Sequence, residues 1–358
     1  MKEKTIDDYR REFYQVYHKE ILPTLIEFEE KRKGSFSFCF FIEVIVIAAF
    51  ALVSYYSLKD ATDIVCQILS LILGLAAIAI PHYMNKNFIK MLKKECMHSL
   101  TKVFGDVEWG NGLFFITDEE LGKSELFAGY NRRSNDDSFK GKYNGVNFVI
   151  SETKLVNQTG SGKNRRRRTI FKGIIINFES NKTIRNKTII TTKWDMHTAR
   201  MGKWMFFSSI LPLFAYIYLF PELKILLIAA VALAIIAIFT FFSKGNGEVM
   251  DEVNLEDPVF EKKFNVYSSD QVEARYLITT AFMERFNNLN TAFGAKKAKC
   301  SFFDNTIMFA ISTHKNLFEI GNLFMRLDDP NRITKFFNEI ASILILVDYF
   351  KLDEHIKL

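Results

Sequence analysis

Four long runs of apolar residues dominate the hydrophobic pattern of this chain. The first two, Phe36 to Tyr56 and Ile64 to Met84, are separated by a short polar turn. The second two, Trp204 to Phe220 and Leu223 to Phe242, follow much later and are almost contiguous. Runs of about 20 residues are long enough to cross a hydrocarbon layer of about 30 Å as helices. The pattern therefore predicts two transmembrane hairpins, with four spans in all.

Amphipathic helical patterns flank the first hairpin on both sides. Residues from about Ile6 to Lys33 carry an apolar stripe among charged positions, and Pro23 should kink or split this helix. A similar stripe runs from Phe88 to Val103. Because two antiparallel spans bring their outer ends to one side of a membrane, we expect the two stripes to pack on each other as a helical stalk.

Patterns typical of β-strands lie between the two hairpins. Runs rich in β-branched residues, bounded by glycine and polar residues, predict strands at 145–150, 169–178 and 188–192. The turn-rich region 122–142 predicts a loop with an edge strand. Four arginines, Arg165 to Arg168, fall in the hairpin loop between two of the strands.

The segment after the fourth run combines both kinds of pattern. In chain order it predicts a strand at 260–266, a helix capped by Ser268 that begins near Asp270, a helix from Thr279, a β-hairpin turning at Asp304 and Asn305, and a terminal helix over 331–349. Strands and helices in separate runs, without regular βαβ alternation, indicate an α+β domain.

These patterns divide the 358 residues into six segments. They are an amphipathic helix (1–35), the first transmembrane hairpin (36–84), a second amphipathic helix (85–105), a β-rich part with the basic loop (106–203), the second hairpin (204–242) and an α+β part (243–358). The fold class is thus a polytopic helical membrane protein with a sheet-plus-helix domain.

Basic residues beside the spans predict their orientation. Lys31, Arg32 and Lys33 precede the first run and four lysines follow the second, whereas the turn between them carries Lys59 beside two aspartates. Basic residues also flank the second hairpin. By the positive-inside rule, both termini and the folded domain are expected in the cytoplasm.

The formal net charge of +6 is concentrated in one region. Residues 157–203 hold twelve basic and two acidic residues. Each of Arg165, Arg166, Arg167 and Arg168 can contribute about 1 kcal/mol against anionic headgroups, which favours contact with the anionic inner leaflet. Since no aromatic platform is interleaved with the run, nucleic acid is not favoured as a partner. The alternative is a solvated loop that helps to fix the topology.

Glu43 lies about a third of the way into the first apolar run, where an ionised carboxylate is costly. Such a residue marks a transport pathway, or it pairs with a neighbouring protomer or with water of the inner leaflet. Gln67 is its nearest polar counterpart in sequence on the second run. The antiparallel arrangement puts the two at different depths, so we do not expect them to meet.

Catalytic, metal and cofactor motifs are not recognisable in this sequence. The four cysteines form no C-x-x-C pair, and the six histidines are scattered. Residues 157–164 lack two defining positions of a phosphate-binding loop. Asp195 with His197, and Asp328 with Asp329, have the residue types of an acid–base pair, but turn and cap residues show the same pattern, and we favour that interpretation. No catalytic residue, cofactor or metal ligand is therefore expected, and an enzyme would need an unrecognised site.

A long motif after the fourth run is the most specific segment of the sequence. It reads Leu255-Glu-Asp-Pro-Val-Phe-Glu-Lys-Lys-Phe-Asn-Val-Tyr-Ser-Ser-Asp-Gln-Val-Glu-Ala-Arg-Tyr-Leu-Ile-Thr-Thr-Ala-Phe-Met-Glu-Arg-Phe286. With the first hairpin and Phe171-Lys-Gly173, it resembles domain-of-unknown-function family 3137, a family of uncharacterised bacterial membrane proteins. The resemblance implies a multi-pass protein of the bacterial inner (plasma) membrane with a cytoplasmic α+β domain, and no activity. The second hairpin has the character of an insertion.

Within this motif, Asp270, Glu273 and Arg275 share one helix and form an interaction surface, unless they only cap and pack that helix. The sequence favours a non-enzymatic regulatory or scaffolding module that contacts anionic lipid or a protein partner. The alternative is an oligomeric transporter or channel component that uses Glu43.

Overall fold

A computed structural model describes residues 6–59, 64–127, 129–180, 182–193, 250–292, 295 and 297–349. The predicted second hairpin, 204–242, lies outside these residues. The chain divides into two compact units, each described by itself. A helical unit comprises residues 1–111, 139–147 and 315–348, and a sheet unit comprises 112–138, 148–314 and 349–358.

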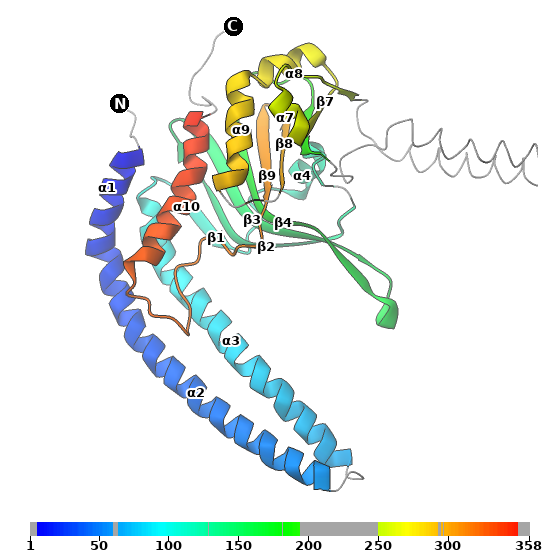
Figure 1. Cartoon of the computed structure of the whole chain (residues 1–358). Coiled ribbons are helices and arrows are strands. Elements are labelled where there is room, and N and C mark those ends of the chain that lie inside the picture. The colour runs from blue at the N-terminus through cyan, green and yellow to red at the C-terminus, as the bar shows by residue number, and fades with distance from the viewer. Residues whose placement is uncertain are drawn as a thin grey trace, which may run out of the picture. The chain divides into compact units, whose positions relative to one another are not determined.

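Long helices build the helical unit (Figure 1). They are α1 (Ile6–Val16), a π-helical turn (Tyr17–Ile21), α2 (Leu22–Lys59), α3 (Ile64–Lys102) and α10 (Pro330–Tyr349). Pro23 is the second residue of α2 and has no N–H to donate to the preceding turn. A π-helical turn ends just before this proline, but the helix continues through it from Asp7 to Lys59, so Pro23 does not split the helix in two.

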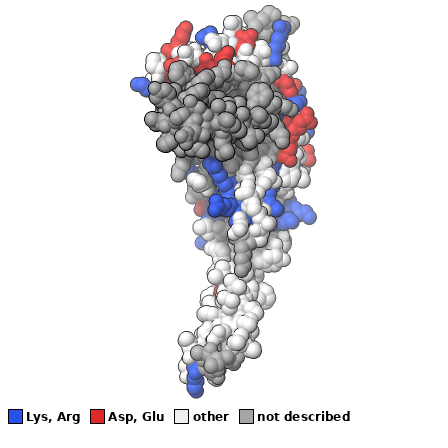
Figure 2. Space-filling model, turned by 90° about the vertical axis from the view of Figure 1, so that its right-hand side faces the viewer, with Lys and Arg blue, Asp and Glu red and all other residues white. Residues whose placement is uncertain are grey.

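The apolar parts of α2 and α3 pack on each other and leave most of their surface exposed. Both helices are long and apolar enough to cross a membrane, and almost none of their most apolar residues is buried. On the face that Figure 2 shows, this stem is almost free of charged side chains. The helices approach closely at Gly74, where a Cβ atom would lie 3.2 Å from the Phe50 ring. A core helix of a water-soluble domain would instead bury such a surface.

The two amphipathic stripes beside the stem are buried, as predicted, and α1 and the π turn contact α3. The sequence did not indicate their third partner, which is α10. Phe337 of α10 lies 4.6 Å from Phe13 and 5.3 Å from Phe104, measured between ring centroids. The core of the helical unit therefore joins segments from both ends of the chain.

A nine-stranded sheet has the order β1-β2-β3-β4-β9-β8-β5-β7-β6. Its strands are β1 (Glu108–Asn111), β2 (Arg132–Tyr143), β3 (Val146–Thr159), β4 (Arg166–Glu179), β5 (Thr188–Thr192), β6 (Asp251–Glu252), β7 (Phe264–Ser268), β8 (Lys297–Phe303) and β9 (Thr306–Ser312). The pairings from β3 to β6 are antiparallel. The mixed α/β composition confirms sheet plus helices.

The short helices of the sheet unit are α4 (Asp118–Ser124), the 3-10 turn Gly162–Asn164, α7 (Pro258–Lys263), α8 (Gln271–Leu277) and α9 (Thr280–Ala292). One core cluster joins Leu121 of α4 to sheet residues such as Phe171 and Ile175. A second cluster is aromatic and includes Phe260, Phe282, Phe286, Phe302 and Phe309. Figure 1 shows α9 lying across β8 and β9.

Three local predictions were wrong, each for a physical reason. Much of the expected loop at 122–142 is the long strand β2, whose polar residues gain ladder partners that a sequence pattern does not reveal. Residues 258–263 form helix α7 and not the start of a strand, because Asp257 caps a helix that begins at Pro258. The cap of α8 is Asp270 and not Ser268.

Candidate functional site

The arginine run lies in a long two-stranded ribbon. Arg166, Arg167 and Arg168 are the first residues of β4 and pair with Thr159, Gln158 and Asn157 of β3. Arg165 directly precedes the strand, and its guanidinium donates a hydrogen bond of 2.7 Å to Gln158 Oε1. All four side chains are exposed. Three of the four arginines thus belong to a paired strand, and only Arg165 lies in the expected loop.

Of the three residues predicted to form an interaction surface on α8, two make hydrogen bonds within the sheet unit itself. The Asp270 carboxylate accepts the N–H groups of Val272 and Glu273 as the N-cap. The Glu273 carboxylate accepts the N–H groups of Arg185 and Asn186, both at 2.8 Å. Arg275 is exposed and makes only long contacts. Asp270 and Glu273 therefore hold the α8 region together, and Arg275 remains available to a partner.

Glu43 lies on α2, and its Oε2 atom is enclosed without a hydrogen-bond partner among the residues that the structure describes. The close approach of Gly74 to Phe50 gives the register of the two helices. Because the helices are antiparallel, an equal number of residues along each from this contact brings Glu43 level with Pro81 and Gln67 level with Ser57. Glu43 and Gln67 are thus at different heights along the stem.

A polar site that the sequence did not indicate lies within the helical unit, beside the ends of the apolar runs. The loop 315–329, just before α10, folds against α2 and α3. Its residue Leu323 receives a hydrogen bond from Arg32 of α2 to its carbonyl oxygen, and its N–H donates to Asn85 Oδ1 of α3, both at 3.0 Å. Leu323 is thus hydrogen-bonded to α2 through its carbonyl oxygen and to α3 through its N–H group.

Arg32 is itself held by Glu29, one turn earlier on α2. Its Nε and Nη2 atoms donate to the two carboxylate oxygens of Glu29, each at 2.8 Å, and the two side chains are only 11% and 8% exposed. Glu29 also accepts the N–H of Leu327 at 3.0 Å. The hydrogen bond from Arg32, with a smaller contribution from Leu327, lowers the pKa of Glu29. This carboxylate is thus kept ionised and fully hydrogen-bonded.

Two further contacts hold the first part of the loop. Lys93 of α3 is buried, and its Nζ lies 2.7 Å from Glu319 Oε1. The N–H of Phe318 donates to Glu339 of α10 at 2.7 Å. Burial raises the pKa of Glu339. Gly321 permits the tight course of the loop, because a Cβ atom there would lie 2.3 Å from Leu327 Cδ2.

An open groove runs beside this loop. Its lining includes Asn85 and Ile89 of α3, Met325 of the loop, and Arg332 and Lys335 of α10. A second hollow shares Met325 and Arg332 and adds three loop residues: Arg326, Asp328 and Asp329. Asp328 pairs with Arg326, and Asp329 accepts the N–H of Asn331 at the start of α10. These last two acids therefore fit the predicted turn and cap roles.

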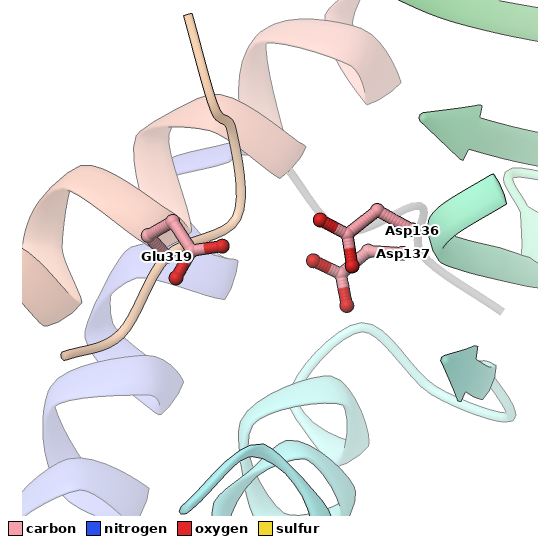
Figure 3. A group of neighbouring side chains, drawn as sticks. All are labelled: Asp136, Asp137 and Glu319. Carbon is pink, nitrogen blue, oxygen red and sulfur yellow. The ribbon is translucent and has the colours of Figure 1, made fainter. Parts of the chain in front are cut away.

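Figure 3 draws three acidic side chains, Asp136, Asp137 and Glu319. Asp136 and Asp137 are successive residues of β2 in the sheet unit, whereas Glu319 belongs to the helical unit. Within its own unit, Glu319 Oε1 accepts hydrogen bonds from Lys93 and Asn316, both at 2.7 Å. These hydrogen bonds show that Glu319 links its own loop to α3.

The sequence offered no signal for the loop site, because its partners are local neither to the loop nor to one another. Arg32 and Leu323 are 291 positions apart. A weak cue was available in Gly321, followed by Leu323 and Leu327 on either side of Phe324 and Met325. Such a pattern predicts that one side of the loop is buried, but it does not indicate which segment that side packs against.

One family model, described as a protein of unknown function (DUF3137), matches residues 169–352. This range begins in β4 and covers the 255–286 motif, the loop 315–329 and α10. No curated protein and no solved structure matches this chain.

Proposed function

The chain belongs to the DUF3137 family of proteins of unknown function, and on this premise we propose that it is a membrane-anchored, non-enzymatic scaffolding or regulatory protein. Helices α2 and α3 cross the membrane as a hairpin, and the folded units act at the membrane surface. The observation that carries the proposal is the exposed apolar surface of the stem, beside segments that are fully packed. Exposed apolar area of this extent needs a lipid environment or a protein partner.

The charges at the ends of the stem supply the orientation. Lys31 and Lys33 of α2 and Lys86 and Lys90 of α3 are at the same end of the hairpin. Lys59 is at the other end, and Asp60 and Asp63 follow it in the sequence. The positive-inside rule puts the tip outside and the folded units in the cytoplasm. We extend this to the bacterial inner membrane on the resemblance described above.

Carbonate extraction and site-specific labelling test the anchor. The full chain should stay in the membrane at alkaline pH. A cysteine placed at Leu58, an exposed residue near the tip, should react with an impermeant maleimide added outside cells, in a background whose native cysteines are replaced. A cysteine at Lys94, which lies on α3 at the end of the hairpin away from its tip, should react only after permeabilisation. Extraction of the chain by carbonate, or labelling of both positions from outside, contradicts the proposal.

The basic ribbon supplies the second part of the proposal, contact with anionic lipid. Four exposed arginines lie together on it, and such groups gain free energy at an anionic surface. Trypsin cleaves after arginine, so the rate of cleavage at these four residues reports how accessible the ribbon is. In the reconstituted full chain, cleavage at Arg165 to Arg168 should be slower in vesicles that contain phosphatidylglycerol than in pure phosphatidylcholine. Cleavage at the exposed control residues Arg185 and Lys262 should not slow, and equal slowing everywhere contradicts ribbon contact.

Glu43 favours one second candidate function, a component of an oligomeric transporter or channel. The observation is its enclosed Oε2 atom, which lacks a hydrogen-bond partner among the described residues of the stem. A carboxylate at this depth is costly unless an ion or a polar group of a neighbouring protomer lies beside it. Glu43→Gln should alter ion flux in reconstituted vesicles if this function holds, and should leave flux at the background level if the chain is only a scaffold.

A further inference from the structure

The segment Leu323 to Leu327 presents an apolar tip on a rigid base. Leu323 and Leu327 are completely buried, whereas Phe324 and Met325 between them are each half exposed. The base is fixed by the hydrogen bonds of Leu323 to Arg32 and Asn85 and of Leu327 to Glu29. Phe324 and Met325 thus form a small exposed apolar surface whose backbone is fixed by hydrogen bonds on both sides.

The tip lies at the height where the apolar runs begin and end. The Phe324 ring contacts that of Phe36 edge-on, with 6.3 Å between centroids. Phe36 is the first residue of the apolar run of α2, and Asn85, which bonds Leu323, directly follows the last residue of the run of α3. In a membrane-spanning hairpin this height is the headgroup region, where aromatic side chains are favoured.

The groove beside the tip carries two cations, Arg332 and Lys335. The guanidinium of Arg332 contacts the sulfur of Met325 and forms no ion pair with any described residue. Lys335 Nζ forms an ion pair of 3.7 Å with Glu339, whose carboxylate also accepts the N–H of Phe318. On the neighbouring face of α3, the exposed Lys86 and Lys90 follow the groove residues Asn85 and Ile89.

Two carboxylates of the groove pair with other cations, and a third accepts a backbone N–H. Glu319 is paired with Lys93, Asp328 with Arg326, and Asp329 with the N–H of Asn331. The groove therefore combines the guanidinium of Arg332, which has no ion pair with a described residue, with an adjacent apolar tip. Phosphate esters that carry acyl chains match both features, whereas a free phosphate matches only the first.

We propose that the segment Leu323 to Leu327 inserts Phe324 and Met325 into the membrane interface, and that the groove beside it binds the phosphate of an anionic phospholipid through Arg332 and Lys335. The inference rests on the proposed membrane-spanning role of α2 and α3. It adds a specific lipid site on the helical unit, distinct from the arginine ribbon of the sheet unit.

Lipid retention tests the groove. The full chain in mild detergent is mixed with phosphatidylglycerol or phosphatidylcholine, and native mass spectrometry measures how much lipid stays bound. The unchanged chain should retain phosphatidylglycerol preferentially, and Arg332→Gln with Lys335→Gln should reduce retention about tenfold or more. The matched control, Lys31→Gln with Lys33→Gln, removes two cations already paired with Glu27 and Glu30 and should retain the lipid. Equal loss in both variants, or no preference between lipids, overturns the proposal, as does retention of inorganic phosphate alone.

Fluorescence quenching tests the tip. Phe324→Trp in the reconstituted full chain should gain emission that lipids brominated near the headgroup quench, relative to the unchanged chain. Val272→Trp, at an exposed apolar position on α8, is the control and should gain emission that is not quenched. Absence of quenching at position 324 in a chain that resists carbonate extraction overturns this inference alone. A chain that carbonate removes instead refutes the proposed membrane anchor.

Discussion

Glu29 and Arg32 form a two-point ion pair one turn apart on α2, and each also binds the backbone of the loop that ends some 300 residues later, at Leu327 and Leu323 respectively. The pair therefore connects the stem to the loop before α10. Because it is almost completely buried, its loss cannot be compensated by water.

Arg32→Met should destabilise the full chain in detergent by about 3 kcal/mol, because it leaves the Glu29 carboxylate buried without its cation. The measurement is denaturant or thermal unfolding, with hydrogen exchange of the loop 315–329 as the local readout. Lys31→Met is the control. It removes an exposed pair with Glu27 and should change stability by about 0.5 kcal/mol or less. Similar effects of the two variants would contradict the assigned role.

Acidification should weaken the loop through Glu29. Its pKa in the folded chain is below the ordinary value of 4.5, so its stabilising contribution is complete above about pH 4.5 and is lost as the pH falls through the folded value. The stability difference between the unchanged chain and Glu29→Gln should therefore shrink on acidification. For Glu339, whose pKa is raised by burial, the corresponding difference should change in the opposite direction. Parallel changes in the two comparisons would contradict these shifts.

Gly173→Ala should destabilise the sheet unit by several kcal/mol or prevent its folding. Gly173 lies in β4 at φ +156°, and a Cβ atom there would lie 2.0 Å from the carbonyl oxygen of Ile311 in β9. The clash is with backbone and cannot relax without breaking the ladder. Gly122→Ala, in α4 with open space around it, should instead be neutral or stabilise by up to about 1 kcal/mol. Unfolding curves of the two variants give the comparison.

Glu273→Ala should cost about 2 kcal/mol, because it leaves the N–H groups of Arg185 and Asn186 without their carboxylate. Asp270→Ala should cost about 1 kcal/mol through the lost N-cap of α8. Arg275→Ala should be nearly neutral for stability, and any effect it has should appear in partner crosslinking. A large loss of stability from Arg275→Ala would remove that residue from the interaction surface.

The thiols of Cys96 and Cys300 should resist alkylation at pH 8 in the folded chain. Burial raises the pKa of Cys96 to about 12 and that of Cys300 well above its usual value, so at pH 8 roughly one Cys96 thiol in 10,000 is ionised. Peptide mass spectrometry after a short iodoacetamide pulse should find both unmodified, and both labelled after unfolding. Rapid labelling of Cys96 without denaturant would contradict the packing of α3 against the first helices.

The local patterns of the chain predicted much of the fold. The strand at 188–192, the turn at Asp304 and Asn305, the terminal helix and the paired stripes were each expected, because hydrophobic periodicity and turn chemistry act over a few neighbouring residues. The family resemblance is confirmed by the match over residues 169–352. The predicted strand from Phe260 failed because the cap at Asp257 outweighed the β-type composition.

The candidate site could not be predicted in the same way. The sequence by itself determined where the long apolar runs, the basic run and the amphipathic helices lie, since each is a property of contiguous residues. Only the tertiary structure decided that Arg32, Asn85 and Leu323 meet, that Glu273 binds the backbone of residues 185 and 186, and that Phe324 lies beside Phe36. Such contacts depend on how distant segments pack, and a polar residue looks the same in sequence whether its partner is water or a buried backbone group.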